Sequence, residues 1–468
     1  FHAVLEGHGT SCAIIIAADQ YADRKLRGMA PKAKLLSYML DLTGQDVYTM
    51  SELLKTFLHA KAQGVDAISI SYGFSTADLA SARFLADFLD REIASAGIVI
   101  AIAAGNSGPG VASVPIDDYM PHHGLSVGAS ISKEQAQNVY GWNGVLEDTI
   151  VWYSGFGPTR GGRQVPDISS PLITWVRGER GASPPSFYGF SGTSSATPAL
   201  VGATTALMSA LKQSGEERIE PRLLKLALQN SAKPFAKIEK IRQGSGLIDV
   251  NAAFDIYKKL AAELRAAKQD ATKRTRFAYE LRAATPLEKR VELGEGVHFR
   301  SFVPMATVTV SMTPDALTLA DPLTTNELLR VEHSGTFFET KSLLSVQAGG
   351  NKLGLAFNAA ALAKPGIYSD VINLRRQDGI VLLQIPVVIE ISSEATTQGI
   401  FMDLAREFAP FDVVRMPIQL DEATAVSFDG LIRQTVNGGP SALKIFFQNT
   451  QGHLVHASTV NVDRAVVP

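Results

Sequence analysis

Short apolar runs alternate with helical patterns from residue 1 to about residue 265, and this alternation narrows the possible folds more than any other feature. Residues 67–71 and 98–102 are apolar runs that predict buried strands. Residues 51–63 carry leucine and phenylalanine at helical spacing, which predicts an amphipathic helix. Strands and helices in alternation favour an α/β fold with a mainly parallel sheet.

After about residue 290 the pattern changes to a period of two. Residues 307–311 (Thr-Val-Thr-Val-Ser) alternate polar and apolar side chains and are rich in β-branched residues, which predicts a half-buried strand. Residues 371–374 and 380–388 flank Asp378-Gly379, a strong signal for a β-hairpin. Residues 413–420 and 443–447 are further candidate strands.

These patterns divide the chain into four parts. We expect an α/β domain over residues 1–265, a helical connector over 266–290, a β-sandwich-like domain over 291–393 and a second β-rich domain over 394–468.

Composition excludes two classes of function. The 468 residues carry a net charge of −2 and no long basic block, so we expect no nucleic-acid partner. The longest apolar run, residues 97–104, is far too short for a membrane span. The one cysteine, Cys12, cannot form an intrachain disulfide, which suits a bacterial secreted, periplasmic or cytosolic protein.

Three separated segments carry residues suited to catalysis. Residues 7–13 read Gly-His-Gly-Thr-Ser-Cys-Ala and lead into a helix. Residues 103–109 read Ala-Ala-Gly-Asn-Ser-Gly-Pro and directly follow a predicted buried strand. Residues 191–198 read Ser-Gly-Thr-Ser-Ser-Ala-Thr-Pro and lead into another helix.

Acyl transfer needs these residue types together. A serine hydroxyl becomes a nucleophile when a neighbouring base, most often histidine, takes its proton. The oxyanion that forms needs fixed donors, which an asparagine side chain and a backbone N–H at a helix N-terminus can supply. Pro198 is expected in the first helical turn, where N–H groups have no helical partner.

The three segments resemble the His, Asn and Ser motifs of the subtilisin family of serine peptidases, and they occur in the family's order. Residues 28–35, 69–73, 154–168 and 244–253 resemble further family segments, so the likeness covers about residues 1–255. It implies a subtilisin-like domain of three layers, followed here by β-rich domains.

The resemblance also implies a role for each matched residue in the hydrolysis of peptide bonds through an acyl-enzyme. His8 would be the general base, Ser194 the nucleophile and Asn106 the oxyanion donor. The substrate would add as an extended strand to a cleft lined by two segments. These are Ser71, Tyr72 and Gly73, and Ala103, Ala104 and Gly105.

One family residue has no counterpart in the sequence. The catalytic aspartate of the family lies upstream of its histidine, and only seven residues, none of them Asp, precede His8. Asp41 follows His8, and Glu6 is too close in sequence to orient the imidazole. Because the chain starts at Phe1, we expect a longer natural polypeptide, whose N-terminal fragment or propeptide would be a partner of this chain.

Several alternatives remain open. An endopeptidase acting on proteins or peptides is the main hypothesis. The β-rich domains after the peptidase region resemble the tripeptidyl-peptidase II subfamily, so a tripeptide-releasing exopeptidase is one alternative, and a catalytically impaired peptide-binding scaffold is another. The habit of the family implies an extracellular or periplasmic protein, with a cytoplasmic one as the alternative.

No cofactor or metal centre is predicted. His122 and His123 are adjacent, and two adjacent rings cannot easily reach one ion, so we interpret them as loop residues. Asp117-Asp118 could hold a structural calcium ion, as in many subtilisins, although no ligand pattern accompanies it. Cys12 is expected to be a small buried core residue.

Overall fold

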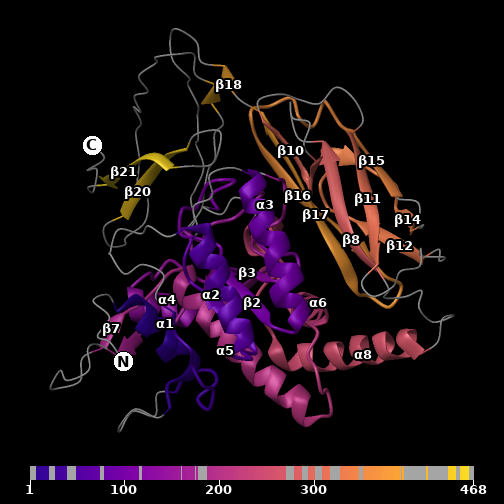
Figure 1. Ribbon diagram of the computed structural model, residues 1–468. Helices are drawn as coiled ribbons and strands as arrows, with labels where there is room; N and C mark the ends of the chain where they lie inside the picture. Colours follow the sequence, from indigo (N-terminus) through magenta and orange to yellow (C-terminus); the bar gives the residue numbers. More distant parts are fainter. Residues whose placement is uncertain are drawn as a thin grey trace.

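The computed structural model combines a central α/β domain with a β-sandwich beside it and a separate β-hairpin (Figure 1). It describes residues 7–19, 27–38, 49–73, 79–114, 119–159, 161–173, 175–177, 187–269, 279–286, 293–300, 308–316, 327–346, 351–391, 393–394, 418–419, 441–448 and 454–462.

A parallel sheet forms the middle of the α/β domain. Strand β1 (Ala67–Ile70) pairs with β2 (Val99–Ala103), β2 with β3 (Leu125–Ile131), and β3 with β5 (Ile168–Pro171), all in parallel. The short β4 (Thr149–Ile150) adds to β3 in the antiparallel direction. Every residue of β2 and β3 is buried, as expected for a parallel sheet that is covered on both faces.

Alternate residues of β2 belong to different cores. Ile100 and Ile102 pack with Leu53 of α2 (Met50–Ala62) and Leu85 of α3 (Leu79–Phe88). Val99 and Ala101 belong to a second apolar core, on the opposite face of the sheet, which contains residues of three further helices. These helices are α5 (Thr193–Gln213), α6 (Pro221–Ser231) and α8 (Val250–Gln269). The sheet therefore lies between two helix layers.

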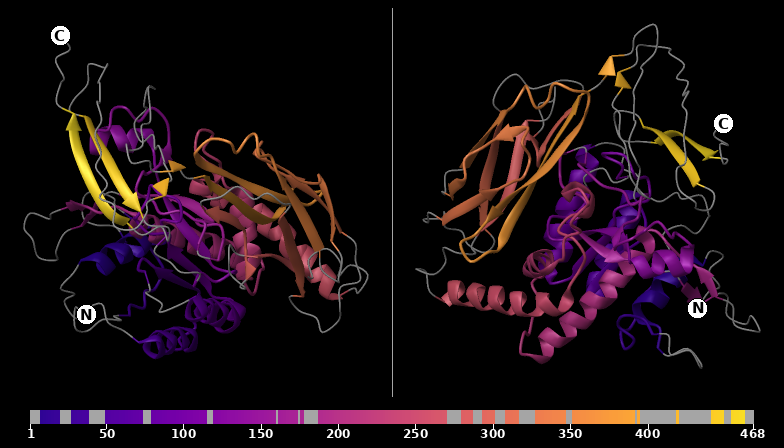
Figure 2. Two further views of the ribbon diagram at one scale, coloured as in Figure 1. Left: turned by 90° about the horizontal axis from the view of Figure 1, so that it is seen from above. Right: turned by 180° about the vertical axis from the view of Figure 1, so that it is seen from behind.

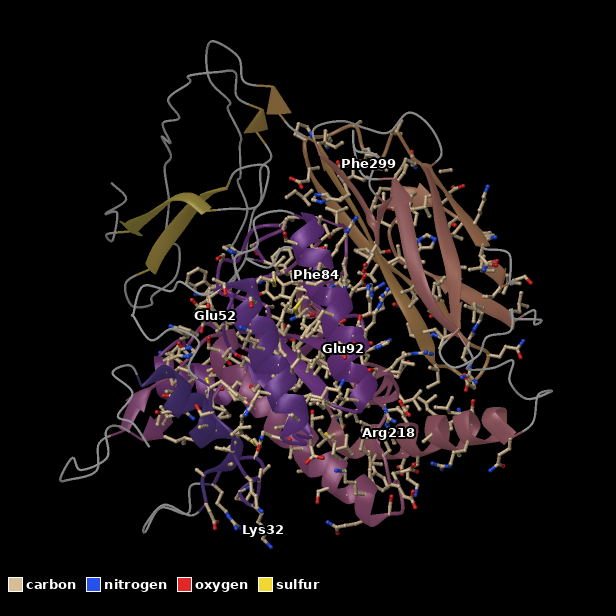
Figure 3. The ribbon with its side chains drawn as sticks, in the orientation of Figure 1. Lys32, Glu52, Phe84, Glu92, Arg218 and Phe299 are labelled. Atoms are coloured by element: carbon tan, nitrogen blue, oxygen red, sulfur yellow. The ribbon has the colours of Figure 1, made fainter. Side chains whose placement is uncertain are left out.

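Smaller elements complete this domain. They are α1 (His8–Ala17), the π-helix Leu89–Ile93, the 3₁₀ helix Ala94–Ala96, α4 (Lys133–Tyr140), α7 (Lys240–Gln243), and the paired strands β6 (Trp175–Arg177) and β7 (Phe187–Gly189). Local sequence sets some of these bounds. For α2, the Thr49 side chain accepts from the Glu52 N–H while the Glu52 side chain accepts from the Thr49 N–H. Figure 3 labels Glu52 on this helix.

Two five-stranded sheets form the sandwich. One has the order β10-β17-β16-β12-β14 and the other β13-β15-β11-β8-β9. Their core combines aliphatic side chains with Phe337 and Phe338. Beside it Phe299, labelled in Figure 3, packs edge-to-face on Phe357 with ring centroids 6.1 Å apart. The bounds are β8 (Tyr279–Pro286), β9 (Leu293–Gly294), β10 (Val297–Arg300), β11 (Val308–Ala316), β12 (Glu327–Glu332), β13 (Phe338–Glu339), β14 (Leu343–Val346), β15 (Asn351–Phe357), β16 (Gly366–Arg375) and β17 (Val381–Ile391).

The prediction of a helical connector over 266–290 is wrong for residues 279–286. These residues form β8, which pairs antiparallel with β11 from Tyr279 opposite Ala316 to Ala284 opposite Ser311. The segment is rich in helix formers, but its place beside β11 overrides that weak preference. The sandwich therefore begins before residue 291, and α8 continues to Gln269, past the expected domain end at 265.

Beyond the sandwich, β20 (Ser441–Gln448) and β21 (Leu454–Val462) form an antiparallel hairpin. Strand β18 (Ser393–Glu394) pairs with β19 (Ile418–Gln419), which is the described part of the candidate strand over 413–420. The other residues of that candidate strand lie outside the described residues.

The sandwich packs directly against the α/β domain, as the two views in Figure 2 show. Val388 of β17 lies in one apolar cluster with Val111, Phe156 and Ile241. Lys240 Nζ lies 3.2 Å from Asp370 Oδ1 across the same boundary. Among the described residues, no helix combines the length and apolar character needed to cross a bilayer.

Candidate active site

Ser194 is the second residue of α5. The helix begins after Gly192, whose φ of 93° and ψ of 174° are open only to glycine at low cost. Ser194 is 9% exposed, and its backbone N–H belongs to the first turn, where helical N–H groups have no partner within the helix. The positive end of the helix dipole therefore lies at this hydroxyl.

Asn106 follows β2 and contacts the start of α5. Its Oδ1 accepts from the Thr193 N–H at 2.9 Å and from the Thr193 hydroxyl at 3.1 Å. The Gly105 N–H donates to the same hydroxyl at 3.1 Å. Because Oδ1 is taken by donors, the Nδ2 group of Asn106 is left to donate beside the N-terminus of α5.

His8 is the first residue of α1 and is exposed. Its ring meets Phe190 edge-to-face, with centroids 5.2 Å apart and planes at 76°. Helix α1 packs against α5, and Phe190 shares an apolar cluster with Ile15 of α1 and Ala199 of α5. His8 and Ser194 therefore occupy the N-terminal ends of two packed helices.

Ser71 follows β1 and also reaches Ser194. Its hydroxyl donates to the Ser194 carbonyl at 2.9 Å, and the Ser194 hydroxyl lies 3.4 Å from the Ser71 carbonyl. The ends of β1 and β2 thus meet the start of α5 at one edge of the sheet. Segments 123 residues apart in the sequence are brought together there.

The profile of the subtilase family matches residues 3–262, more than half of the chain. The chain belongs to the subtilase family.

Tripeptidyl-peptidase 2 proteins are among the relatives of this subtilase. The Drosophila melanogaster protein is 25% identical over 401 residues, which cover 82% of this chain and 26% of that protein. The Caenorhabditis elegans protein is 27% identical over 249 residues, which cover 53% of this chain and 18% of that protein. Human membrane-bound transcription factor site-1 protease is 29% identical over 267 residues, which cover 53% of this chain and 22% of that protein. The subtilase chain thus spans about a quarter or less of each relative's length.

A crystal structure of tripeptidyl peptidase 2 has a TM-score of 0.62 with this subtilase at 22% identity, covering 84% of this chain and 30% of that one. This likeness shows the fold. The prediction of a subtilisin-like α/β domain with a mainly parallel sheet and β-rich regions after it is confirmed.

The residues expected to line the cleft differ in exposure in this subtilase. Tyr72 is 41% exposed and Gly73 is also exposed, whereas Ser71 and Gly105 are partly buried. Ala103 and Ala104 are 6% and 0% exposed, because they continue the central strand β2 and the Ala104 N–H bonds the Val127 carbonyl. Of this second segment, Gly105 therefore has the most exposed surface.

The expected place of Pro198 is wrong. Helix α5 begins at Thr193, so Pro198 is its sixth residue and lies inside the helix. There a proline removes a helical hydrogen bond, which a residue of the first turn would not. The sequence motif does not reveal this, because it does not say at which residue the helix starts.

Cys12 lies on α1, one turn after His8. It is half-buried, and its Sγ is 3.5 Å from the Ser194 carbonyl oxygen. Burial raises the pKa of the Cys12 thiol above its ordinary value, more than the contact with Ser71 lowers it. Cys12 is therefore a neutral thiol that contacts the backbone of Ser194.

His122 and His123 engage different carboxylates. Nε2 of His122 lies 3.2 Å from Oε1 of Glu295, and Nδ1 of His123 lies 3.5 Å from Oδ1 of Asp90. Within the described ranges, no group of three or more His, Cys, Asp or Glu side chains could hold a metal ion. Asp117-Asp118, the candidate calcium site, lies outside the described residues.

Sequence reasoning missed two residues that build the site. Thr193 fixes the carboxamide of Asn106, and Phe190 contacts the ring of His8. Thr193 directly precedes the nucleophile, but nothing in the motif says that its side chain reaches a loop 87 residues earlier. Phe190 follows from no local pattern.

Proposed function

We propose that this subtilase hydrolyses peptide bonds of proteins or peptides through an acyl-enzyme on Ser194. The observation that carries the proposal is the fixed carboxamide of Asn106, which directs a donor to the helix end that holds Ser194. A fixed donor of this kind stabilises charge that develops on a carbonyl oxygen.

The proposed reaction has two halves. Ser194 Oγ attacks the scissile carbonyl carbon while His8 takes the hydroxyl proton, and the oxyanion binds Nδ2 of Asn106 and the Ser194 N–H. The tetrahedral species collapses, His8 gives the proton to the leaving amine, and the acyl group stays on Ser194. Water, deprotonated by His8, then releases the acid. In the family an aspartate orients the histidine.

Substrate binding is proposed at the ends of β1 and β2. An extended peptide would lie along residues 71–73 and 103–105, whose backbone continues two parallel strands up to Ser194. Peptides and proteins are the proposed partners. Secretion, expected from the habit of the family, stays a prediction.

A tripeptide-releasing exopeptidase is the second candidate. The Drosophila relative, named a tripeptidyl-peptidase, is similar across 82% of this chain, which extends beyond the peptidase region into the sandwich. Pairs of fluorogenic peptides that differ only in a free or acetylated N-terminus distinguish the candidates. An exopeptidase requires the free amine, whereas an endopeptidase cleaves both and also cleaves internally quenched peptides.

Labelling with a fluorophosphonate tests the chemistry directly. We expect covalent label on Ser194, identified by peptide mapping, and loss of the label in Ser194→Ala. Ser209→Ala, an exposed serine on the same helix, is the matched control and should label normally. A folded protein that binds peptides but takes no label would be a scaffold, and the proposal would be wrong.

A further inference from the structure

The carbonyl of Ser194 lacks its helical partner. In an α-helix this oxygen accepts from the N–H four residues later, which here belongs to Pro198. Proline has no N–H, and its ring crowds the carbonyl four residues before it. Because Ser194 is 9% exposed, little water can reach this oxygen, and an unpaired buried carbonyl would be costly.

Two donors from other elements take the place of that N–H. The Ser71 hydroxyl, at the end of β1, donates to the Ser194 oxygen at 2.9 Å. The Cys12 thiol, on α1, makes a weaker contact at 3.5 Å. The start of α5 is thereby tied to the central sheet and to the helix that carries His8.

The tie is reciprocal at Ser71. Its own carbonyl lies 3.4 Å from Oγ of Ser194, a long hydrogen bond that meets the nucleophile from the same side. One residue therefore contacts both the backbone oxygen and the side-chain hydroxyl of Ser194. A residue that only lined a substrate cleft would have no need for the first contact.

We propose that Ser71 is a positioning residue for Ser194: its hydroxyl replaces the helical donor that Pro198 lacks and fixes the nucleophile against the sheet. The inference rests on the proposed role of Ser194 as nucleophile. It gives Ser71 a function separate from contact with the peptide. A misplacement of reacting atoms by about 1 Å can cost ~10²-fold in rate, so the tie matters for catalysis.

The test uses the natural full-length protein and the rate constant for fluorophosphonate labelling of Ser194. This small probe needs no extended peptide site, so it reports the nucleophile and not peptide binding. We expect Ser71→Ala to slow labelling by about 10-fold to ~10²-fold. Ser71→Thr, which keeps a hydroxyl donor, should stay within a few-fold of wild type, as should the control Ser209→Ala.

Pro198→Ala supplies the decisive comparison, because it restores an N–H that can bond the Ser194 oxygen. Alone it should change the labelling rate little, since a carbonyl can accept two hydrogen bonds and the new N–H can replace the weak Cys12 contact at 3.5 Å while the Ser71 bond stays. Combined with Ser71→Ala it should recover most of the lost rate. A general structural defect at Ser71 would not be repaired by a new donor four residues along α5.

Each outcome decides between readings. A wild-type protein without label overturns the proposed function itself. If the wild type is labelled and Ser71→Ala is labelled within about two-fold of the wild-type rate, the positioning role is overturned. The same conclusion follows if Ser71→Ala is labelled slowly and adding Pro198→Ala does not restore the rate. Thermal melting checks folding of every variant. If Ser71→Ala does not fold, Ser71→Cys, a weaker donor, is compared with and without Pro198→Ala, and the same rescue is required.

Discussion

Oδ1 of Asn106 accepts two hydrogen bonds from Thr193, at 2.9 Å from the backbone nitrogen and 3.1 Å from the hydroxyl. Both partners can donate, so the atom they face is the oxygen of the carboxamide and Nδ2 lies on the other branch. The Thr193 hydroxyl in turn accepts from the Gly105 N–H. These bonds between the loop after β2 and the start of α5 thus fix the orientation of the Asn106 carboxamide and of its Nδ2 donor.

Replacing Asn106 should reduce the rate of the chemical step. Asn106→Ala removes the Nδ2 donor, and loss of one oxyanion donor typically costs ~10²–10³ in kcat. We expect KM to change little, because the donor acts mainly on the transition state. Steady-state kinetics on a fluorogenic peptide measure both. Asn143→Ala, at an exposed asparagine, is the control. A rise in KM alone would contradict the assigned role.

Gly192 should tolerate no side chain, for two reasons that can be separated. Gly192→Ala places a Cβ 3.0 Å from Nδ2 of Asn106 and forces alanine to φ of 93°. The backbone strain should cost about 1–3 kcal/mol, and the displaced carboxamide should also lower kcat.

Gly215→Ala is the matched control for this strain. Gly215 has a similar φ of 99°, but an added Cβ would have no neighbour within 4 Å. It should lose stability, measured by urea unfolding, while kcat stays near wild type. Equal losses of kcat in both variants would mean that strain alone, and not the contact with Asn106, controls activity.

Lys225 should stabilise the buried carboxylate of Asp167. The Nζ–Oδ1 distance is 2.8 Å, and Asp167 is 6% exposed. Burial by itself raises the pKa of Asp167, but Lys225 and Arg163 outweigh burial and hold that pKa below its ordinary value of 3.8. Lys225→Met leaves the carboxylate without its closest cation, so the free energy of unfolding should fall by about 3–5 kcal/mol.

The pH dependence follows from the sign of that shift. A carboxyl whose pKa is lower in the folded state stabilises the fold above its ordinary pKa, and this contribution is lost as pH falls through the folded pKa. Urea unfolding from neutral pH down into the acid range should show the loss in wild type and a shallower dependence in Lys225→Met. Lys212→Met, which removes an exposed pair with Asp66, should cost only about 0–1 kcal/mol.

Asn230 should couple the sandwich to the α/β domain. Its Nδ2 donates to the Val381 carbonyl at 3.0 Å, and its Oδ1 accepts from the Val381 N–H at 2.7 Å. Asn230→Ala leaves both groups of β17 without these partners and should lower the free energy of unfolding by about 1–3 kcal/mol. Asn230→Asp keeps the acceptor but sets a carboxylate oxygen against the Val381 carbonyl, so at neutral pH it should lose at least as much. Unchanged stability in both variants would mean that the two hydrogen bonds between Asn230 of α6 and Val381 of β17 do not stabilise the protein.

The sequence by itself determined the features that depend on local pattern. The apolar run at 98–102 predicted β2, because a strand buried on both faces must be apolar along its length. The run at 67–71 predicted β1 as a strand, but of its residues only Ile70 is buried. The motifs around His8, Asn106 and Ser194 indicated the family, because acyl transfer needs those residue types on short rigid segments. Neither inference required knowledge of which segments touch.

Only the tertiary structure decided the contacts between distant segments. It made a strand of Tyr279–Pro286, because pairing with β11 outweighed the helical preference of its residues. It brought Ser71 to the carbonyl that Pro198 leaves unbonded, 123 residues along the chain. Such contacts depend on how the sheet and the helices pack. The local sequence pattern does not identify which distant residue will be in contact.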